Sequence, residues 1–408
     1  MTELPTWVEI DLDVLRQNLS VIRGALGGQK ILLVVKADAY GLGAVEVTRE
    51  ALASGVEMLG VATLHEGIEL RRAGIGAPVL ILSPSLTGEA AEIVEHGLRC
   101  TVSRLAMVQE LARAARAAEQ VQAVHLEVDT GMGRSGVTPA EAVPLARAVA
   151  GEPSLRLEGL YTHFPDADAS DLSFAQEQLR RFLEVRAEIE RADVTVPLVH
   201  AANSAALARI PGAVLDLVRP GLLVYGLRPP EVPDSFAVRP VMSFRSRLLQ
   251  VRELPAGHPI SYGRTFVTPQ AMRVGVVGVG YGHGLSRDLS NRGQMLVRGK
   301  RVPVVGRVTM DMTMVDLGSV PEAQVEDEVV VFGEQGGAVI PIEEVAAVSG
   351  TVPYEIMCSI GKRVPRVFCR GDAAVKITTL IGERRRGTGG RRVEYAVSGP
   401  QAAPLGDR

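Results

Sequence analysis

Short apolar runs alternate with helical stretches from about residue 30 to about residue 220. The runs are ILLVV (31–35), EMLGVA (57–62), PVLIL (78–82), LRCTV (98–102), VQAVHLEV (121–128), LRLEGLYT (155–162), PLVHA (197–201) and AVLDLVR (213–219). Strands that alternate with helices pair in parallel through right-handed crossovers. Eight such units in about 200 residues are typical of a closed (β/α)8 TIM barrel. An open doubly wound sheet is the alternative.

The pattern changes after about residue 236, where short strands are separated by Gly and Pro turns. This change predicts a second, mostly β domain. We therefore expect an α/β chain with a barrel over 11–235 and a mostly β domain over 236–380. The N-terminal segment 1–10 can join the β domain, and the Gly-, Arg- and Pro-rich tail 381–408 is expected to be mobile.

The composition excludes several classes of function. With a net charge of −3, the chain has no global field to hold nucleic acid or anionic lipid. The three cysteines are scattered and show no metal-ligand spacing, which fits a reducing cytoplasm and predicts no metal. The longest apolar runs have the length of strands, so no membrane span is expected, and the acidic N-terminus argues against a signal peptide.

Polar side chains follow the predicted barrel strands at their carboxyl ends, where such barrels place reactive groups. These residues are Lys36, Tyr40, Glu127, Arg134, Thr162, His163, His200, Asn203, Ser204 and Arg219. Lys36 comes directly after five apolar residues, and desolvation there favours a nucleophilic amine. A lysine that snorkels at a strand end is the alternative. Since the chain has only five lysines among its 44 basic residues, we favour a Schiff-base lysine and a pyridoxal phosphate site.

Arg219 is the second anchor of this interpretation, although a salt-bridging arginine is the ordinary alternative. An arginine cannot accept a proton. If it faced the pyridine nitrogen, that nitrogen would stay neutral and the ring would be a weak electron sink. Backbone N–H groups near 203–204 and 221, with the Ser204 hydroxyl, can bind a phosphate. A helix N-cap is an equal interpretation of the Asn203–Ser204 pair.

Nine motifs follow one another along the chain, namely VVKADAYGLG, VDTGMGRSGV, LYTHF, HAANSAA, VRPGLLVYG, ISYGRTF, VGYGHG, VGRVTMDMTMVD and TVPYEIMC. In kind and in order they resemble the motifs of bacterial alanine racemases. The resemblance runs from about Trp7 to Ile377. It implies a cytoplasmic bacterial enzyme that interconverts L-alanine and D-alanine through pyridoxal 5'-phosphate and supplies D-alanine for peptidoglycan.

The resemblance also implies roles for individual residues. Lys36 and Tyr262 resemble the two acid/base groups, and Lys36 also resembles the lysine that binds the cofactor. Residues that resemble the other cofactor ligands are Tyr40, His163, Asn203, Ser204, Arg219, Gly221, Leu222 and Tyr354. Residues that resemble substrate ligands are Arg134, Met310 and Asp311. Supporting or entrance positions are Glu127, Tyr281, His283, Arg287 and Arg307.

In this family Tyr262, Tyr281, Met310 and Asp311 act on the active site of the partner subunit, so the resemblance implies a homodimer with shared sites. Three positions depart from the usual pattern. Glu127 stands where the family often has a carbamylated lysine, and since a carboxylate carries the same charge to orient Arg134, carbon dioxide dependence is not expected. His283 replaces an acid at the entrance, and Leu42 replaces a frequent histidine.

Two other functions stay open at this stage. A serine or broad-specificity racemase of the same fold is the close alternative, because one hydroxyl or methylene changes discrimination by only about 1–3 kcal/mol. A non-catalytic pyridoxal phosphate carrier is the alternative from another class. Such carriers resemble the barrel alone, whereas this chain has a β domain and Tyr262.

Overall fold

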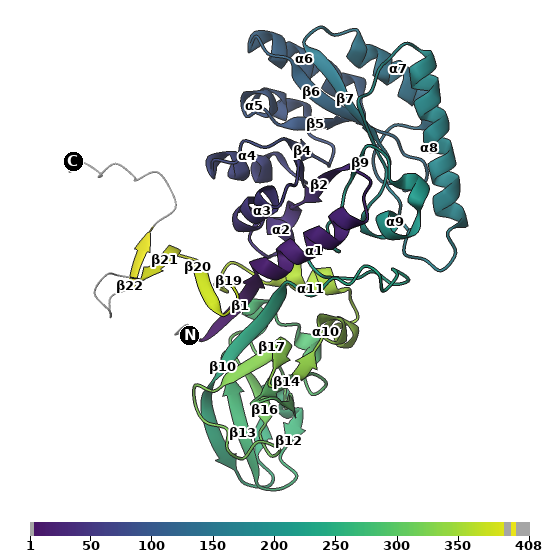
Figure 1. Cartoon of the computed structure of the whole chain (residues 1–408). Helices are drawn as coiled ribbons and strands as arrows, with labels where there is room; N and C mark the ends of the chain where they lie inside the picture. The colour runs from purple at the N-terminus through teal and green to yellow at the C-terminus, as the bar shows by residue number, and fades with distance from the viewer. Residues whose placement is uncertain (1–3, 387–392, 397–408) are drawn as a thin grey trace, which may run out of the picture. The chain divides into compact units, whose positions relative to one another are not determined.

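The computed structural model describes residues 4–386 and 393–396 (Figure 1). The chain divides into two compact units. The barrel unit is Val14–Arg239, and the β unit joins the N-terminal residues up to Asp13 with the chain from Pro240 onward. Within the described residues, no helix combines the length and the apolar character that a membrane crossing requires.

The barrel unit contains one parallel sheet of eight strands in the order β8-β7-β6-β5-β4-β3-β2-β9. The strands are β2 (Lys30–Val34), β3 (Met58–Val61), β4 (Val79–Ile81), β5 (Arg99–Val102), β6 (Gln122–Glu127), β7 (Leu155–Tyr161), β8 (Leu198–His200) and β9 (Leu217–Val218). All eight fall inside the apolar runs that the sequence analysis singled out or extend them by one residue. The predicted TIM-like fold is therefore confirmed.

Backbone hydrogen bonds also join the two ends of this sheet. The N–H of Asp216 donates to the carbonyl of Val199 over 3.0 Å, and the N–H of Arg219 donates to the carbonyl of Ala202 over 2.8 Å. A closed sheet has no exposed edge. The closure also fixes the backbone of Arg219 against the carboxyl end of β8.

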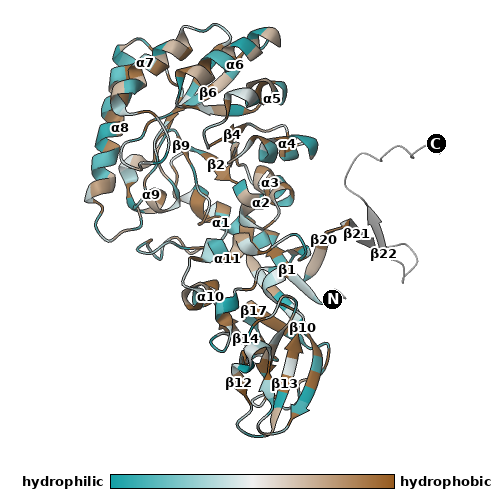
Figure 2. Cartoon of the chain, turned by 180° about the vertical axis from the view of Figure 1, so that it is seen from behind, coloured by the Kyte–Doolittle hydropathy of each residue, from teal (hydrophilic) through white to brown (hydrophobic). Residues whose placement is uncertain are grey.

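Helices follow the strands of the barrel. They are α1 (Leu12–Gly24), which begins in the β unit, α2 (Lys36–Tyr40), α3 (Ala44–Ala53), α4 (Leu64–Arg72), η1 (Thr87–Glu89), α5 (Ala90–Glu95), α6 (Leu105–Ala117), α7 (Pro139–Ala150), α8 (Ser173–Arg191), α9 (Ser204–Arg209) and η2 (Pro211–Ala213). In α8 the buried positions include Ala175, Leu179, Phe182 and Val185, which follow the spacing of one helical face. Figure 2 shows hydrophilic and hydrophobic residues recurring along this helix.

Four strands of the barrel contribute to one apolar cluster. Its buried members are Leu32, Val34, Met58, Leu80 and Leu217, and Tyr40 packs against them. Gly60 makes room for this cluster, since a Cβ there would lie 2.6 Å from Cδ2 of Leu32. The cluster supports the segment that carries Lys36, because Leu32 and Val34 belong to the strand that leads into it.

The β unit is built on a twelve-stranded sheet with the order β15-β14-β17-β10-β1-β19-β20-β21-β22 along its main path. Its strands are β1 (Thr6–Asp11), β10 (Met242–Leu254), β13 (Met272–Val277), β14 (Gln294–Val297), β15 (Lys300–Pro303), β16 (Thr313–Asp316), β17 (Glu328–Gln335), β18 (Ala338–Ile340), β19 (Arg366–Arg370), β20 (Ala373–Thr379), β21 (Gly382–Arg386) and β22 (Val393–Ala396). A separate pair is β11 (Pro259–Ile260) with β12 (Phe266–Val267). Its helices are η3 (Tyr262–Arg264), η4 (Tyr281–His283), η5 (Arg287–Leu289), α10 (Ile342–Ser349) and α11 (Pro353–Ser359).

The N-terminal segment forms a central strand of this sheet. β1 pairs antiparallel with β10 and parallel with β19. Its Trp7 is buried, and the hydroxyls of Thr6 and Ser246 lie 3.0 Å apart. Of the segment 381–408, for which we expected mobility, residues 381–386 and 393–396 are described, with β21 and β22 paired, and the remainder lies outside the described residues.

Leu32→Ala should destabilise the barrel unit by about 2–5 kcal/mol, because it leaves a cavity in the cluster. Gly60→Ala should also destabilise it, since the new Cβ meets Leu32. In the double variant the small side chain at 32 removes the closer contact, and only the contact with Cδ1 of Leu82 at 2.9 Å remains. The loss measured by urea unfolding should therefore be smaller than the sum of the single losses. Additive losses would contradict this description of the packing.

Candidate active site

Lys36 follows β2 directly and opens a turn of unusual handedness. The next four residues, Ala37, Asp38, Ala39 and Tyr40, have positive φ angles of 52°, 54°, 51° and 56°. Each left-handed residue costs roughly 1–2 kcal/mol, so the surrounding structure must hold the turn in place. The turn positions Lys36 and Tyr40 at the carboxyl end of the barrel, where such folds place reactive groups.

One carboxylate, that of Glu66 in the helix that follows the neighbouring strand β3, holds this turn. Its Oε1 accepts from the N–H of Ala37 over 2.7 Å, and its Oε2 accepts from the N–H of Ala62 over 2.7 Å. Glu66 also forms a capping box with Thr63 at the start of α4. The group that caps α4 therefore also fixes the backbone beside Lys36.

Ser204, Gly221 and Tyr40 come together at the same end of the barrel. The Ser204 hydroxyl oxygen accepts from the N–H of Gly221 over 3.0 Å and from the N–H of Leu223 over 3.4 Å. A Cβ on Gly221 would lie 3.1 Å from the hydroxyl oxygen of Tyr40. Glycine therefore lets a backbone turn approach two hydroxyl groups closely. Leu222 lies within that turn.

Asn203 acts as the N-cap of α9. Its Oδ1 accepts from the N–H of Ala206 over 3.0 Å, and its Nδ2 donates to the carbonyl of Phe164 over 3.2 Å. The capping interpretation of the Asn203–Ser204 pair thus describes Asn203, while the Ser204 hydroxyl faces the turn at Gly221.

Arg219 is buried, with 4 % of its surface exposed. Its Nη2 donates to the carbonyls of Thr162 and Ala201 over 2.7 Å and 3.0 Å, and its Nη1 donates to Nδ1 of His200 over 2.9 Å. Nδ1 of His163 lies 3.4 Å from Nη2. All four partners are neutral acceptors, so none of the hydrogen bonds that Arg219 makes within the described part of the chain goes to a carboxylate.

The electrostatics of this cluster follow from burial. Burial lowers the pKa of Arg219 to about 10, which leaves the guanidinium charged at neutral pH. Burial, followed by the charges of Arg219 and Arg134, lowers the pKa of His163 to about 3. Burial and the charge of Arg219 also lower the pKa of His200 well below its usual value. Both histidines are therefore neutral at physiological pH.

Glu127 is buried at the end of β6, just before the loop that carries Arg134. Burial raises the pKa of Glu127, while the Ser135 hydroxyl and the charges of Arg219 and Arg134 act in the opposite direction. Its Oε2 has no hydrogen-bond partner among the described residues. Arg134 is exposed, and the structure shows no ion pair between it and Glu127.

Tyr262 and Arg307 lie together in the β unit. Tyr262 is 70 % exposed and begins η3. The guanidinium of Arg307 packs against the next residue, since a Cβ on Gly263 would lie 3.2 Å from its Cζ. The Ser261 hydroxyl donates to the carbonyl of Arg307 over 2.6 Å. A single turn therefore presents the Tyr262 side chain to solvent.

A second group in the β unit joins η4 to the segment that contains Met310. The N–H of Tyr281 donates to the carbonyl of Thr309 over 3.0 Å, and the N–H of Gly282 donates to the carbonyl of Met310 over 2.9 Å. Gly280 permits this approach, because a Cβ there would lie 2.2 Å from the carbonyl oxygen of Thr309. Met310 and Tyr281 are 52 % and 44 % exposed.

Charged and helical groups surround η4. Arg363 donates to Oδ1 of Asp311 over 2.8 Å. Burial and the charge of Arg363 lower the pKa of His283, whereas Asp311 raises it. The α11 helix, which contains Tyr354, ends against η4, where the Ser359 hydroxyl donates to the carbonyl of Gly284 over 3.0 Å.

Arg287 lies in η5, which is tied to the segment of Arg307. The hydroxyl of Ser290 donates to the carbonyl of Arg287 over 2.5 Å and accepts from the N–H of Val308 over 3.0 Å. The structure thus gathers the predicted residues into two sets, one in each unit. The sets are Lys36, Tyr40, Glu127, Arg134, His163, Asn203, Ser204, Arg219, Gly221 and Leu222, and then Tyr262, Tyr281, His283, Arg287, Arg307, Met310, Asp311 and Tyr354.

Two residues that shape the site were absent from the predicted set. Glu66 could have been noticed from the spacing of Thr63 and Glu66, which is typical of a capping box. Asp129 accepts from the N–H groups of Gly131 and Met132 over 2.9 Å and 2.8 Å, and so organises the loop of Arg134. An Asp that precedes glycines is a common turn signal.

Two family models match the chain. The alanine racemase N-terminal domain matches residues 10–229, and the alanine racemase C-terminal domain matches residues 241–368. An alanine racemase of Desulfosudis oleivorans is 45 % identical over 386 residues, which are 92 % of this chain and 99 % of that protein. One of Desulforamulus reducens is 44 % identical over 368 residues, which are 89 % of this chain and 99 % of the relative.

Solved structures agree with these relatives. The alanine racemase of Clostridium difficile 630 superposes with a TM-score of 0.89 at 33 % identity, covering 93 % of this chain and 99 % of the other. The alanine racemase of Bacillus anthracis with bound L-Ala-P has a TM-score of 0.87 at 36 % identity, covering 93 % of this chain and 98 % of the other. Matches of this length across both units show that the chain belongs to the alanine racemase family of isomerases.

Proposed function

We propose that this chain interconverts L-alanine and D-alanine with pyridoxal 5'-phosphate, using Lys36 and Tyr262 of the partner subunit as its two bases. The observation that carries the proposal is the donor set at the carboxyl end of the barrel. It combines a lysine on a strained turn, a buried arginine and a cradle of hydroxyl and backbone N–H groups.

The residues present fit this cofactor. The Ser204 hydroxyl, the Tyr40 hydroxyl and the glycine turn at Gly221 have the donor chemistry that a phosphate ester needs. Lys36 supplies a primary amine for the aldehyde, and Arg219 supplies a cationic donor for the ring nitrogen. The bound cofactor would withdraw electrons from Cα of the amino acid and so acidify its proton.

The chain's own residues then move the proton. In this proposal Nζ of Lys36 accepts or returns the Cα proton on one face of the substrate, and the Tyr262 hydroxyl of the partner subunit does so on the other face. Arg219 donates hydrogen bonds but cannot accept a proton. It would therefore leave the ring nitrogen of a bound cofactor unprotonated, which would favour return of the proton to Cα.

A homodimer with shared sites is part of the proposal. Tyr262, Tyr281 and Met310 are large side chains that are 70 %, 44 % and 52 % exposed in the single chain. Exposed apolar groups that cluster on one unit are typical of a surface that a partner covers. We also propose Arg134, Met310 and Asp311 as contacts to the substrate carboxylate.

The relatives favour alanine over a broader set of amino acids as the substrate. The two relatives named above are both alanine racemases, at 45 % and 44 % identity. We place the reaction in the bacterial cytoplasm, where D-alanine would be supplied for peptidoglycan. The scattered cysteines suit that reducing compartment. A non-catalytic carrier is disfavoured by the second family model at 241–368, which includes Tyr262.

Borohydride reduction of the cofactor-loaded enzyme should attach the cofactor covalently to Lys36, because this amine lies at the carboxyl end of the barrel. Peptide mapping by mass spectrometry measures the result. Lys30→Arg, at the other end of the same strand, is the matched control and should keep the label. A label on Lys300 or Lys362 would exclude the assignment.

Arg219→Glu should reduce racemisation by about 100-fold or more and open transamination, which pyruvate formation from alanine measures. A carboxylate would keep the ring nitrogen protonated and strengthen the electron sink. Arg219→Lys is the control, because lysine retains the positive charge and, like arginine, can only donate hydrogen bonds. It should slow racemisation without releasing pyruvate. A glutamate variant that racemises normally would contradict the electronic argument.

Tyr262→Ala should impair the two faces of the substrate unequally. Removing one base should abolish exchange of the α-proton of one enantiomer, while Lys36 still exchanges that of the other. Deuterium uptake from D2O into each enantiomer, read by mass spectrometry, measures both. Cofactor absorbance checks that the variant is loaded. Equal losses for both enantiomers would point to a single base.

A further inference from the structure

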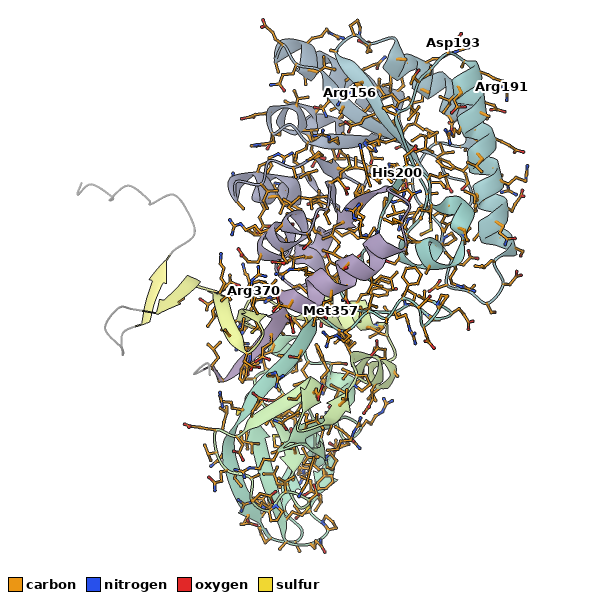
Figure 3. All side chains as sticks on the ribbon, in the orientation of Figure 1. Arg156, Arg191, Asp193, His200, Met357 and Arg370 are labelled. Atoms are coloured by element: carbon orange, nitrogen blue, oxygen red, sulfur yellow. The ribbon has the colours of Figure 1, made fainter. Side chains whose placement is uncertain are left out.

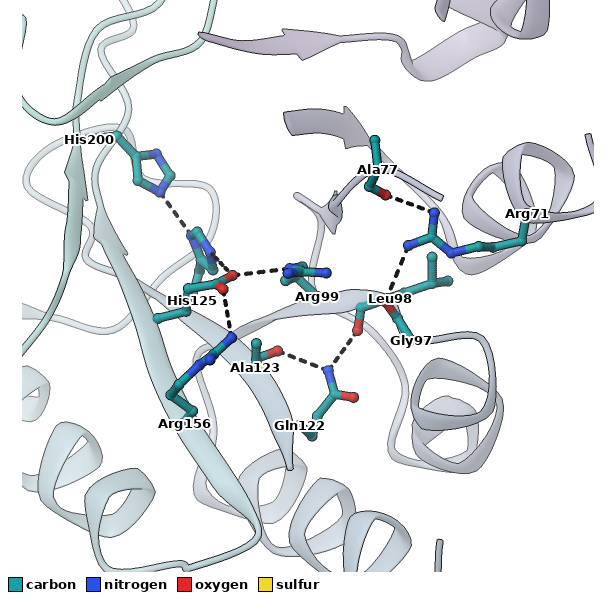
Figure 4. A network of polar contacts seen from close by, with 11 residues as sticks. Arg71, Ala77, Gly97, Leu98, Arg99, Gln122, Ala123, His125, Arg156 and His200 are labelled. Carbon is teal, nitrogen blue, oxygen red and sulfur yellow. Dashed lines mark hydrogen bonds and ion pairs between the residues drawn. The ribbon is translucent and has the colours of Figure 1, made fainter. Parts of the chain in front are cut away.

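A chain of buried imidazoles leads away from Arg219 through the barrel. Nη1 of Arg219 lies 2.9 Å from Nδ1 of His200, and Nε2 of His200 lies 2.9 Å from Nδ1 of His125. Nε2 of His125 then lies 3.2 Å from Oε2 of Glu158. Figure 4 shows the contact between His200 and His125, and the dashed lines that lead on from His125 toward Arg99 and Arg156. Both histidines are 0 % exposed.

Glu158 ends the chain beside two arginines. Nε of Arg99 lies 3.1 Å from its Oε2, and an Nη of Arg156 lies 2.8 Å from its Oε1. Burial raises the pKa of Glu158, but the hydrogen bond from His125 and the charge of Arg99 lower it to about 2. Glu158 is therefore ionised and can only accept hydrogen bonds. Figure 3 shows His200 and Arg156 as separate positions in the barrel unit.

The two ends of the chain dictate where its protons lie. Arg219 can only donate, so Nδ1 of His200 must be the acceptor. A neutral His200 then carries its hydrogen on Nε2 and donates to Nδ1 of His125. A neutral His125 carries its hydrogen on Nε2 and donates to Glu158. Burial lowers the pKa of both histidines, which supports the neutral forms.

The packing around the chain is specific. A Cβ on Gly159 would lie 2.2 Å from Nδ1 of His125, so the imidazole occupies space that only glycine leaves. The ring of Tyr161 stacks on His200 with centroids 4.8 Å apart and an angle of 11° between the planes. The Tyr161 hydroxyl in turn lies 3.0 Å from the hydroxyl of Thr101. Both imidazoles therefore pack closely against residues of β7.

We propose that Glu158 is a positioning residue for Arg219. By accepting the hydrogen on Nε2 of His125, it fixes His125 and His200 in one tautomer, so that His200 always presents an acceptor to the guanidinium. The importance of this acceptor for racemisation rests on the proposed function, whereas the tautomers themselves do not.

Loss of the Glu158 carboxylate removes the acceptor that fixes the direction of the hydrogen bonds between the two histidines. With no acceptor at Nε2, His125 can hold its hydrogen on Nδ1 and donate to His200. His200 would then carry its hydrogen on Nδ1, against the N–H of Arg219. Two donors that face each other across a buried contact repel, and an unpaired buried donor is costly. The guanidinium would lose one of its neutral acceptors and its orientation.

The test is ¹⁵N NMR of the full-length chain with labelled histidine, recorded with and without pyridoxal phosphate. Ring ¹⁵N shifts and couplings report the tautomer, and single His→Gln variants assign the signals of His125 and His200. Glu158→Leu removes the acceptor, and Glu158→Gln keeps an acceptor oxygen. Arg156→Gln is the matched control, because it removes an ion pair from the same carboxylate but leaves the contact to His125.

The wild type, E158Q and R156Q should show both histidines with the hydrogen on Nε2. E158L should show a second tautomer and a fall in kcat of about tenfold, a size typical of supporting residues. The conservative E158Q should restore most of that kcat. A purely structural ion pair would lower the melting temperature in all three variants and leave the tautomers unchanged.

Hydrogen on Nδ1 of either histidine in the wild type would overturn the proposal, and this measurement decides even where E158L fails to fold. Unchanged tautomers in a folded E158L would overturn it as well. If the wild type shows the expected tautomers but does not racemise alanine, the proposed function fails while the assignment of the chain stands.

Discussion

The buried charge of Arg219 is the constraint that organises the carboxyl end of the barrel. A buried cation is tolerated only where its donors are satisfied. The backbone supplies two acceptors, the carbonyls of Thr162 and Ala201, from the segments that follow β7 and β8. The bond from the N–H of Arg219 to Ala202 closes the sheet at the same place. The backbone of Arg219 therefore helps to close the barrel, and its side chain is held by the same region of the chain.

The sequence could predict the barrel because each strand is an apolar run of strand length and the runs alternate with helical stretches. The α8 helix is an example, since its buried positions follow helical spacing. Lys36 and Arg219 could be found because polar residues that directly follow such strands must lie at one end of the barrel. The residue types at those ends, rather than any single motif, pointed to a cofactor with an aldehyde and a phosphate.

Other features depend on contacts that no local pattern encodes. The residue types of Ala37, Asp38 and Ala39 do not predict a left-handed backbone, because alanine has no intrinsic preference for it. The carboxylate of Glu66, which accepts from the N–H of Ala37, comes from a helix that is distant in the sequence. His125 lies in an apolar run, and its contact with Glu158 depends on a shift of register between β6 and β7. The short α11 helix also escaped notice, although a proline at its first position is a recognised start signal.

Because its acceptors are neutral, Arg219 keeps a charge that an adjacent carboxylate would cancel. An adjacent carboxylate would cancel the charge locally, and the guanidinium would then have less field to offer a ligand. Here Glu127 forms no ion pair with any residue that the structure describes, and burial raises its pKa. Glu158 lies two imidazoles away and already shares its charge with Arg99. The cation is thus held in place by hydrogen bonds to neutral acceptors, and it keeps its charge at neutral pH.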